Sequence, residues 1–473
     1  MILKRFYDEK LAQASYLIGC AATGDAIVID PSRDLEPYFA MAEAEGVEIR
    51  HVTETHIHAD FVSGLRELAT RTGATAYLSS EGGPDWSYAF ADEIGARLVG
   101  EGDEFMVGNI RFTVLHTPGH TPEHLTFLVT DTAAADRPIG ALTGDFVFVG
   151  DVGRPDLLEK AAGVTGTMEA GARDLYRSLT RFRELPEWLQ IWPGHGAGSA
   201  CGKGLSSIPH STLGYEKRFN PAFAVDSEDA FVAFVLDGQP EPPVYFAHMK
   251  RMNREGPAIL RGFPEPDTGT LQHLEALRGS GAQVVDTRSA ADYGAGHVPG
   301  TLNIPLNRSF NTWAGWLLPY DADLHLIVDE AHRHEAVRDL AMIGLDRVAT
   351  TFAPSVVEAW ASAGGELGTV ELRTPEEVEW RTDREDTTVL DVRGRTEWEA
   401  GHLPGVEAIP VGHLTRHLDR IPRDGELILH CQSAGRSAIA ASLLQRAGFT
   451  NVSHMAGGFA AWQAQGRPVV RDA

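Results

Sequence analysis

Two histidines and an aspartate stand close together in the segment THIHAD, residues 55–60. The segment follows residues 48–52, where apolar and polar side chains alternate, and this pattern predicts a strand. Residues two apart in an extended chain point to the same side, so His56 and His58 are expected to share a face. Neutral imidazole and carboxylate suit a transition ion such as iron or zinc. The segment is a candidate metal site; the alternative is a polar surface loop whose histidines are accidental.

Three further motifs place a histidine or a carboxylate at the end of an expected strand. They are HTPGHT at residues 116–121, ALTGD at residues 141–145 and WPGHG at residues 192–196. A glycine stands beside the polar residues in each motif, and glycine allows the backbone to approach an ion closely. These motifs therefore supply candidate ligands that the fold has to bring to the first segment.

The elements that must position these motifs alternate between short strands and helices. Residues 26–29 predict an apolar strand, and strands dominate from about residue 97 to residue 129. Helices are expected over residues 35–45 and 61–72. This alternation is consistent with two sheets that are covered by helices.

The motifs THIHAD, TPGHT, TGD and PGHG, in this order and spacing, resemble the metallo-β-lactamase superfamily over roughly the first 240 residues. The resemblance implies an αββα sandwich. In that superfamily the first motif often ends in a further histidine that helps to hold a second metal, whereas Phe61 stands at that position here. A phenyl ring cannot bind a metal, so a two-metal hydrolase site is disfavoured.

Within the superfamily the chain resembles the persulfide dioxygenases best, and this implies one Fe(II) per chain. The implied ligands are His56, His120 and Asp145. Such a set leaves open positions for O2 and a sulfur ligand. Three more residues would orient the ligands or hold water, namely His58, Asp60 and His195. The alternative is that His58 and Asp60 are ligands themselves.

Two residues of this part are candidates for binding a thiol substrate. Arg154 follows a glycine-rich loop, and its planar guanidinium suits a carboxylate of the substrate. It could instead pair with Asp151 or Asp156. Tyr215 could line the pocket, or it could be an ordinary half-buried tyrosine.

The three cysteines are far apart in the sequence, so each is a possible free thiol. Cys201 lies in GHGAGSACGK, a stretch that resembles bacterial persulfide dioxygenase–rhodanese fusions. A nearby cation favours a reactive thiolate, and Lys203 is close in sequence. We therefore expect Cys201 to handle sulfur or to gate the substrate; the alternative is a small apolar filler. Cys20 is expected to be a packed core thiol.

The last 200 or so residues repeat themselves. The echoed segments are DTR (286–288) and DVR (391–393), GHVPG (296–300) and GHLPG (401–405), and Pro305 and Pro410. The offset is the same for all three pairs, so this is a duplicated domain. Each copy predicts an α/β domain with a parallel sheet. The shared aspartate, arginine and Gly-His turn could serve only the fold.

The second copy alone has a cysteine in a position to react. Cys431 follows the expected strand 427–429 and precedes an apolar helix from Ala438. Backbone N–H groups of such a loop and the helix dipole stabilise a thiolate, which makes it a better nucleophile. Arg436 adds positive charge or binds an anionic substrate. The first copy carries no cysteine, and we interpret it as a spacer or a docking domain.

The two copies resemble the rhodanese family, with one active and one inactive member. Four residues separate Cys431 from Arg436, namely Gln432, Ser433, Ala434 and Gly435. Related phosphatases have one more residue in this loop and cradle a phosphate. The tighter ring suits a sulfur atom that Cys431 carries as a persulfide.

Length and charge limit the number of domains and the kinds of binding partner. The chain has 473 residues, more than one hydrophobic core usually serves, and we expect domains at 1–250, 265–365 and 370–473. A formal net charge of −25 argues against nucleic acid or an anionic membrane as a partner. No apolar run is long enough to span a bilayer, and acids interrupt residues 1–9 where a signal peptide would be apolar. We expect a cytoplasmic homo-oligomer.

The whole chain resembles bacterial persulfide dioxygenase–sulfurtransferase fusions, and this resemblance implies a sulfur-detoxifying enzyme. The iron site oxidises a low-molecular-weight thiol persulfide with O2 to sulfite, and Cys431 passes a sulfane sulfur to sulfite to give thiosulfate. One rival is a zinc-dependent thioester hydrolase that resembles glyoxalase II, fused to a sulfurtransferase. Another is a sulfur carrier or sensor whose metal domain only binds a partner. In a third, the cysteine loop runs in reverse and uses thiosulfate to make persulfide.

Overall fold

The computed structural model describes residues 1–162, 166–382 and 384–471. These residues form two compact units. The first unit consists of Met1–Gly262 with Ala341–Gly344, and the second contains the remaining residues from Phe263 onward. None of the helices in the described ranges combines the length and the apolar character that crossing a membrane requires.

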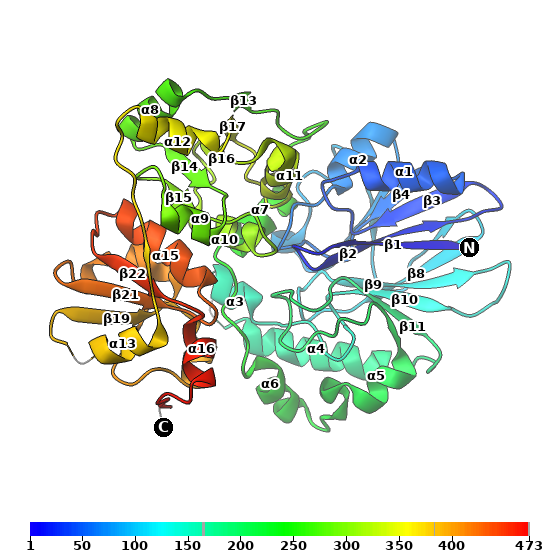
Figure 1. The fold of residues 1–473 in the computed structure, drawn as a ribbon. Coiled ribbons are helices and arrows are strands. Elements are labelled where there is room, and N and C mark those ends of the chain that lie inside the picture. The colour runs from blue at the N-terminus through cyan, green and yellow to red at the C-terminus, as the bar shows by residue number, and fades with distance from the viewer. Residues whose placement is uncertain (163–165, 383, 472–473) are drawn as a thin grey trace. The chain divides into compact units, whose positions relative to one another are not determined.

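The first unit contains two stacked six-stranded sheets (Figure 1). In sheet order, the first is β1 (Ile2–Asp8), β2 (Gln13–Gly19), β3 (Asp25–Ile29), β4 (Glu48–Thr53), β5 (Thr75–Ser79) and β6 (Arg97–Val99). The second, also in sheet order, is β12 (Ser211–Thr212), β11 (Gln190–Pro193), β10 (Gly140–Gly144), β9 (Leu125–Asp131), β8 (Ile110–His116) and β7 (Glu104–Val107). A core that includes Ile29, Phe112 and Phe127 fills the space between them.

Helices cover the outer face of each sheet. On the first sheet, α1 (Glu36–Glu45) and α2 (Leu65–Thr72) bury Tyr38 and Leu68. On the second, α4 (Met168–Phe182) and α6 (Glu228–Leu236) bury Leu175 and Phe231. The remaining helices of this unit are η1 (Pro84–Trp86), α3 (Leu157–Ala162), α5 (Leu213–Phe219), η2 (Pro221–Ala224) and α7 (Phe246–Glu255). The predicted αββα sandwich is confirmed. The helix expected over 61–72 begins only at Leu65, because residues 61–64 continue the histidine loop.

The second unit contains two five-stranded parallel sheets with the same strand order (Figure 1). One is β13 (Asp267–Thr268), β17 (Val348–Phe352), β16 (Leu324–Ile327), β14 (Gln283–Asp286) and β15 (Leu302–Asn303). The other is β18 (Glu371–Arg373), β22 (Val452–Met455), β21 (Glu426–His430), β19 (Thr387–Asp391) and β20 (Glu407–Ala408). The strands correspond one to one, as expected for a duplicated domain. The predicted α/β architecture of this part is therefore confirmed.

Each copy adds helices around its sheet. The first has α8 (Leu271–Ser280), α9 (Ala290–Ala295), α10 (Phe310–Leu317), η3 (Glu330–His332), α11 (Arg333–Met342) and α12 (Ser355–Ser362). The second has α13 (Pro375–Thr382), α14 (Arg395–Glu399), η4 (Val411–Arg416), η5 (Leu418–Arg420), α15 (Gly435–Arg446) and α16 (Gly458–Ala464).

The repeated Asp–Arg motif makes the same contacts in both copies. Arg288 Nη2 lies 2.6 Å from Asp286 Oδ2 and donates to the carbonyl of Gly296. Arg393 Nη2 lies 2.7 Å from Asp391 Oδ2 and donates to the carbonyl of Gly401. The motif ties the end of a central strand to the Gly-His turn, so it holds the fold in both copies, with or without a cysteine.

Candidate metal centre and sulfur-transfer loop

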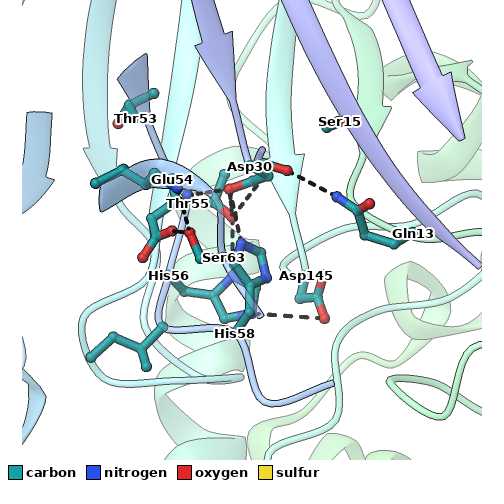
Figure 2. Close-up of polar contacts among 12 residues, drawn as sticks. Gln13, Ser15, Asp30, Thr53, Glu54, Thr55, His56, His58, Ser63 and Asp145 are labelled. Carbon is teal, nitrogen blue, oxygen red and sulfur yellow. Dashed lines mark hydrogen bonds and ion pairs between the residues drawn. The ribbon is translucent and has the colours of Figure 1, made fainter. Parts of the chain in front are cut away.

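Three strand ends bring together the three residues that were predicted as ligands. His56 follows β4, His120 follows β8 and Asp145 follows β10. All three are buried, and one potential ligand atom from each lies within 4.8 Å of the others. Asp145 Oδ2 is 3.5 Å from His120 Nε2 and 3.9 Å from His56 Nε2. Figure 2 shows His56 and Asp145 facing one another across this cluster.

Hydrogen bonds fix which ring nitrogen of each histidine is free. The Thr55 hydroxyl donates to Asp30 and therefore accepts from His56 Nδ1, which lies 3.0 Å away. His120 Nδ1 donates to the carbonyl of Arg154 at 3.0 Å. The lone pair of each ring is then on Nε2, on the side of Asp145. Burial lowers the pKa of both imidazoles, and neutral imidazole is the form that binds a metal.

The carboxylate of Asp145 is buried and lacks ordinary polar partners. Among the residues that the structure describes, neither of its oxygens accepts a hydrogen bond of normal geometry. Burial would raise the pKa of this carboxyl, but the positive charge that His195 and His120 carry when protonated outweighs burial and lowers it. A buried anion without hydrogen bonds is costly unless a cation compensates it. Two neutral imidazoles and this carboxylate therefore fit a divalent metal ion.

A second buried cluster lies beside the first and consists of Asp60, His195 and Cys201. His195 Nδ1 donates to the carbonyl of Ala12 at 3.0 Å, and its Nε2 faces the cluster. This Nε2 lies 3.2 Å from Asp60 Oδ2 and 3.5 Å from Asp145 Oδ1. Asp145 thus stands between the two clusters, with one oxygen toward each.

His58 is engaged by a residue that the sequence analysis did not single out. Its Nε2 lies 3.1 Å from Asp30 Oδ1 (Figure 2). Burial alone would lower the pKa of His58, but Asp30, with the carboxyls of Glu54 and Asp60 nearby, outweighs burial and raises it to about 9. Asp30 also accepts from the Thr55 backbone N–H at 2.6 Å. The signal for Asp30 was present in the sequence, because it ends an apolar strand with a carboxylate, as Asp145 does.

The candidate sulfur-transfer loop, residues 431–436, runs from the end of β21 into the first residues of α15. Cys431 is buried directly after the strand, and its Sγ lies 3.6 Å from Ser437 Oγ in the first turn of the helix. Ala434 has a φ of 76°, a left-handed conformation that a non-glycine residue rarely adopts and that lets the loop close on the helix. Arg436 forms a two-pronged ion pair with Glu397 at 2.5 and 2.6 Å.

Comparisons with known proteins agree with this architecture. The family model described as "Metallo-beta-lactamase superfamily" matches residues 9–195, and the model described as "Rhodanese-like domain" matches residues 374–465. A crystal structure of a metallo-β-lactamase from Staphylococcus aureus subsp. aureus COL is 45% identical, with a TM-score of 0.70. The match covers 74% of this chain and 99% of that chain. The chain belongs to the metallo-β-lactamase superfamily.

Relatives within the superfamily carry different activities. Persulfide dioxygenase ETHE1 of Mus musculus is 26% identical over 234 residues, which cover 48% of this chain and 78% of the mouse protein. A hydroxyacylglutathione hydrolase of Rhodospirillum rubrum is 29% identical over 260 residues, covering 50% of this chain and 91% of the hydrolase. Membership of the metallo-β-lactamase superfamily therefore gives the fold and a metal site, and the reaction has to be argued from the site.

Arg154 of this superfamily member does not have the role that was predicted for it. Its side chain is fully buried, with Nε and Nη2 donating to the carboxylate of Asp156 at 2.8 and 2.7 Å. Two further N–H groups donate to the carbonyls of Ala200 and Pro240. With four of its five N–H groups engaged inside the protein, the guanidinium no longer offers a two-pronged site for a substrate carboxylate. Its own carbonyl instead orients His120.

The environment of Cys201 also differs from the prediction. Lys203 donates to the carbonyls of Phe234 and Asp237, so its charge does not activate the thiol. Burial, together with the carboxylates of Asp145 and Asp60, raises the pKa of Cys201 well above its ordinary value. Cys201 is nevertheless next to the candidate metal centre, as part of the second cluster. Tyr215 is 51% exposed on α5 and lies against the ring of Phe219, so we leave it out of the site.

Asn253 on α7 holds the histidine loop and was not found from the sequence. Its Nδ2 donates to the carbonyls of His58 and Phe61 at 2.8 and 2.7 Å, and its Oδ1 accepts from the Ser63 N–H at 2.9 Å. The side chain is buried. One amide therefore satisfies three backbone groups in a loop that has no regular structure of its own.

We expect Asn253→Ala to destabilise the first unit by about 3 kcal/mol, because it leaves three buried backbone groups without partners. Metal affinity should fall about 10- to 100-fold, since the loop that carries His56 loses its support. Thermal unfolding and metal titration test both effects. Asn253→Asp, which keeps the acceptor for the Ser63 N–H but loses both donors, should lie between the wild type and Asn253→Ala. Wild-type metal affinity in Asn253→Ala would contradict the supporting role.

Two buried histidines near Cys431 predict acid sensitivity of this domain. Burial lowers the pKa of His430 and of His454 to about 4. A histidine in the unfolded chain titrates near 6.5, so between about pH 6.5 and 4 the unfolded state binds protons that the folded state does not. Stability therefore falls as the pH falls through this window, by about 3 kcal/mol per histidine over its full width.

We expect His430→Phe, which cannot take up a proton, to reduce this loss by about half, because His454 remains. Hydrogen exchange of the β21 amides at pH 7 and pH 5, corrected for the intrinsic exchange rate, measures the effect. An unchanged pH dependence in His430→Phe would show that His430 does not contribute.

Proposed function

We propose that this protein oxidises a low-molecular-weight thiol persulfide to sulfite and then converts the sulfite to thiosulfate. The first reaction is RSSH + O2 + H2O → RSH + SO3²⁻ + 2H⁺. The observation that supports it is the buried set of two imidazoles and one carboxylate that accepts no hydrogen bond, namely His56, His120 and Asp145. This combination is typical of mononuclear Fe(II) oxygenases.

In this proposal Fe(II) is held by His56, His120 and Asp145, and when bound it supplies open positions for O2 and the substrate sulfur. Thr55 and the Arg154 carbonyl engage Nδ1 of the two rings, so both Nε2 atoms would be free to hold the ion. The burial of the cluster limits access of bulk water. His195 and Asp60, whose Nε2 and Oδ2 lie 3.2 Å apart, offer an acid–base pair for the water molecule whose oxygen ends in sulfite.

The residue at position 61 supports one metal rather than two. His58 Nε2 faces Asp30, and its ring centre lies 4.5 Å from that of Phe61, the residue that replaces a further histidine. His58 Nδ1 is buried without a hydrogen-bond partner among the described residues, so Phe61 alone, whose ring cannot bind a metal, disfavours a second ion. The similarity to persulfide dioxygenase ETHE1 is consistent with this choice.

The second reaction belongs to Cys431, with RSSH + SO3²⁻ → RSH + S2O3²⁻ as the sum. The Cys431 thiolate attacks the outer sulfur of a second persulfide, and the thiol leaves. Sulfite then takes that sulfur from the Cys431 persulfide. The N-terminus of the 12-residue helix α15 favours the anionic forms of both sulfur species. Because both sites are on one chain, sulfite is released near its acceptor.

Oxygen uptake tests the proposal. Purified protein reconstituted with Fe(II) and given glutathione persulfide should consume one O2 for each sulfite plus thiosulfate formed. The rival is a zinc-dependent thioester hydrolase, which the similarity to hydroxyacylglutathione hydrolase favours. Two zinc ions per chain, thioester hydrolysis and no oxygen uptake with persulfide would establish the rival instead.

A further inference from the structure

A cavity of about 500 Å³ lies between the cysteine-bearing copy and the cysteine-less copy of the second unit. The cysteine-bearing copy contributes Ser433, Gly435 and Arg436 to its wall, which are half of the loop that runs from Cys431 to Arg436. The facing wall comes from the cysteine-less copy and includes Asn307, Ser309 and Trp313. The copy without a nucleophile thus forms one side of a cavity at the reactive loop.

Specific contacts hold the two walls together. The backbone N–H of Asn303, on β15, donates to Ser442 Oγ, on α15, at 3.0 Å. The Trp316 ring of α10 lies 5.4 Å from the His413 ring, centre to centre. It also covers Gly412, where a side chain would come within 2.4 Å of the ring. Since α15 starts at the sulfur-transfer loop and α10 carries Trp313, these contacts fix the facing wall relative to the loop.

The size and lining of the cavity indicate what it takes. A volume of about 500 Å³ is within the range of pockets for drug-sized molecules and far exceeds the needs of sulfite or thiosulfate. The charge of Arg436 is matched by Glu397, so the wall carries no unmatched charge. It combines the indole of Trp313, the amide of Asn307 and several hydroxyls with the apolar side chains of Ala290, Pro305, Leu306 and Ile439. Such a surface suits an amide-containing body that can hydrogen-bond and also bury apolar parts.

We propose that this cavity binds the organic part of the persulfide that donates sulfur to Cys431, and that Trp313 and Asn307 set its preference for a peptide-like thiol. The inference rests on the sulfur-transfer step of the proposed function. In that step the Cys431 thiolate attacks the outer sulfur of RS–SH, the S–S bond breaks, and RS⁻ leaves and takes a proton. Two electrons move with the leaving thiolate, and no external oxidant or reductant is needed. The cysteine-less copy therefore determines donor specificity.

The test measures how fast Cys431 gains a sulfur atom, by mass spectrometry of the full chain. Anaerobic conditions exclude O2 and so prevent oxidation of the persulfide at the metal site. Glutathione persulfide and thiosulfate are compared as donors. The quantity compared is the efficiency of Cys431 loading by glutathione persulfide divided by that by thiosulfate. Trp313→Ala and Asn307→Ala should each lower this ratio by about tenfold, which corresponds to about 1.4 kcal/mol. Trp313→Phe, which keeps an aromatic face, should recover most of the ratio.

Trp380→Ala is the matched control, because Trp380 lies on α13 of the same unit and is 66% exposed. It should leave the ratio unchanged. The inference is overturned if the ratio stays at the wild-type value in both Trp313→Ala and Asn307→Ala. This includes the case in which loading efficiency falls equally with both donors. Failure of the wild type to load Cys431 from either donor would instead refute the proposed sulfur transfer itself.

Discussion

His120→Ala is expected to abolish persulfide-dependent oxygen consumption and to leave the protein almost free of metal. The substitution removes one of three ligands and leaves the buried carboxylate of Asp145 with a single imidazole, His56, on its Oδ2 side. Loss of a residue that only supports a ligand costs 10- to 100-fold in metal affinity, so loss of the ligand itself should cost more than about 100-fold. Metal analysis after reconstitution with Fe(II), together with an oxygen electrode, measures both effects.

His210→Ala is a suitable control, because His210 is an exposed histidine of the same unit and is not part of either cluster. It should bind metal and consume oxygen as the wild type does. If His120→Ala kept one iron per chain and normal oxygen uptake, the assignment of the ligands would be wrong. Retained metal with lost uptake would instead assign His120 a role in the reaction rather than in binding.

Cys431→Ser is expected to stop thiosulfate formation and to make sulfite accumulate in its place, at about one sulfite per O2. A serine hydroxyl is not ionised at neutral pH and cannot carry a sulfane sulfur, whereas the metal cluster consists of other residues. Oxygen uptake should therefore continue at the wild-type rate. Separate assays of sulfite and thiosulfate after complete consumption of a known amount of glutathione persulfide measure the change.

Cys20→Ser is the matched control, since Cys20 is a buried cysteine that accepts from the Asn109 N–H and is far from both sites in sequence. It should still form thiosulfate. The Cys431 substitution also tests the direction of the sulfur transfer. If the wild type consumed oxygen with thiosulfate and a thiol, and Cys431→Ser did not, then the loop would supply persulfide to the metal site and our order of reactions would be reversed.

Local sequence patterns indicated the motifs that gather at the candidate metal centre, and the resemblance to persulfide dioxygenases singled out the three implied ligands among them. His56, His120 and Asp145 each follow a short strand, and the ends of strands in stacked sheets meet at one edge of the sandwich. The glycines next to them mark the turns that such positions need. The duplicated domain and the loop after Cys431 were also predictable, because a repeat at a constant offset and a strand–loop–helix pattern are properties of the chain itself.

The partners of individual polar side chains were decided only by the tertiary structure. Arg154 pairs with Asp156 and two carbonyls inside the protein, although its sequence context suited a substrate ligand equally well. Asn253 supports a loop almost two hundred residues earlier in the chain. Strand and helix patterns report short-range periodicity and chain geometry, whereas a hydrogen bond across the fold depends on which surfaces finally pack. For the same reason the sequence did not predict the cavity at the Cys431 loop, because its two walls come from separate copies of a repeated domain.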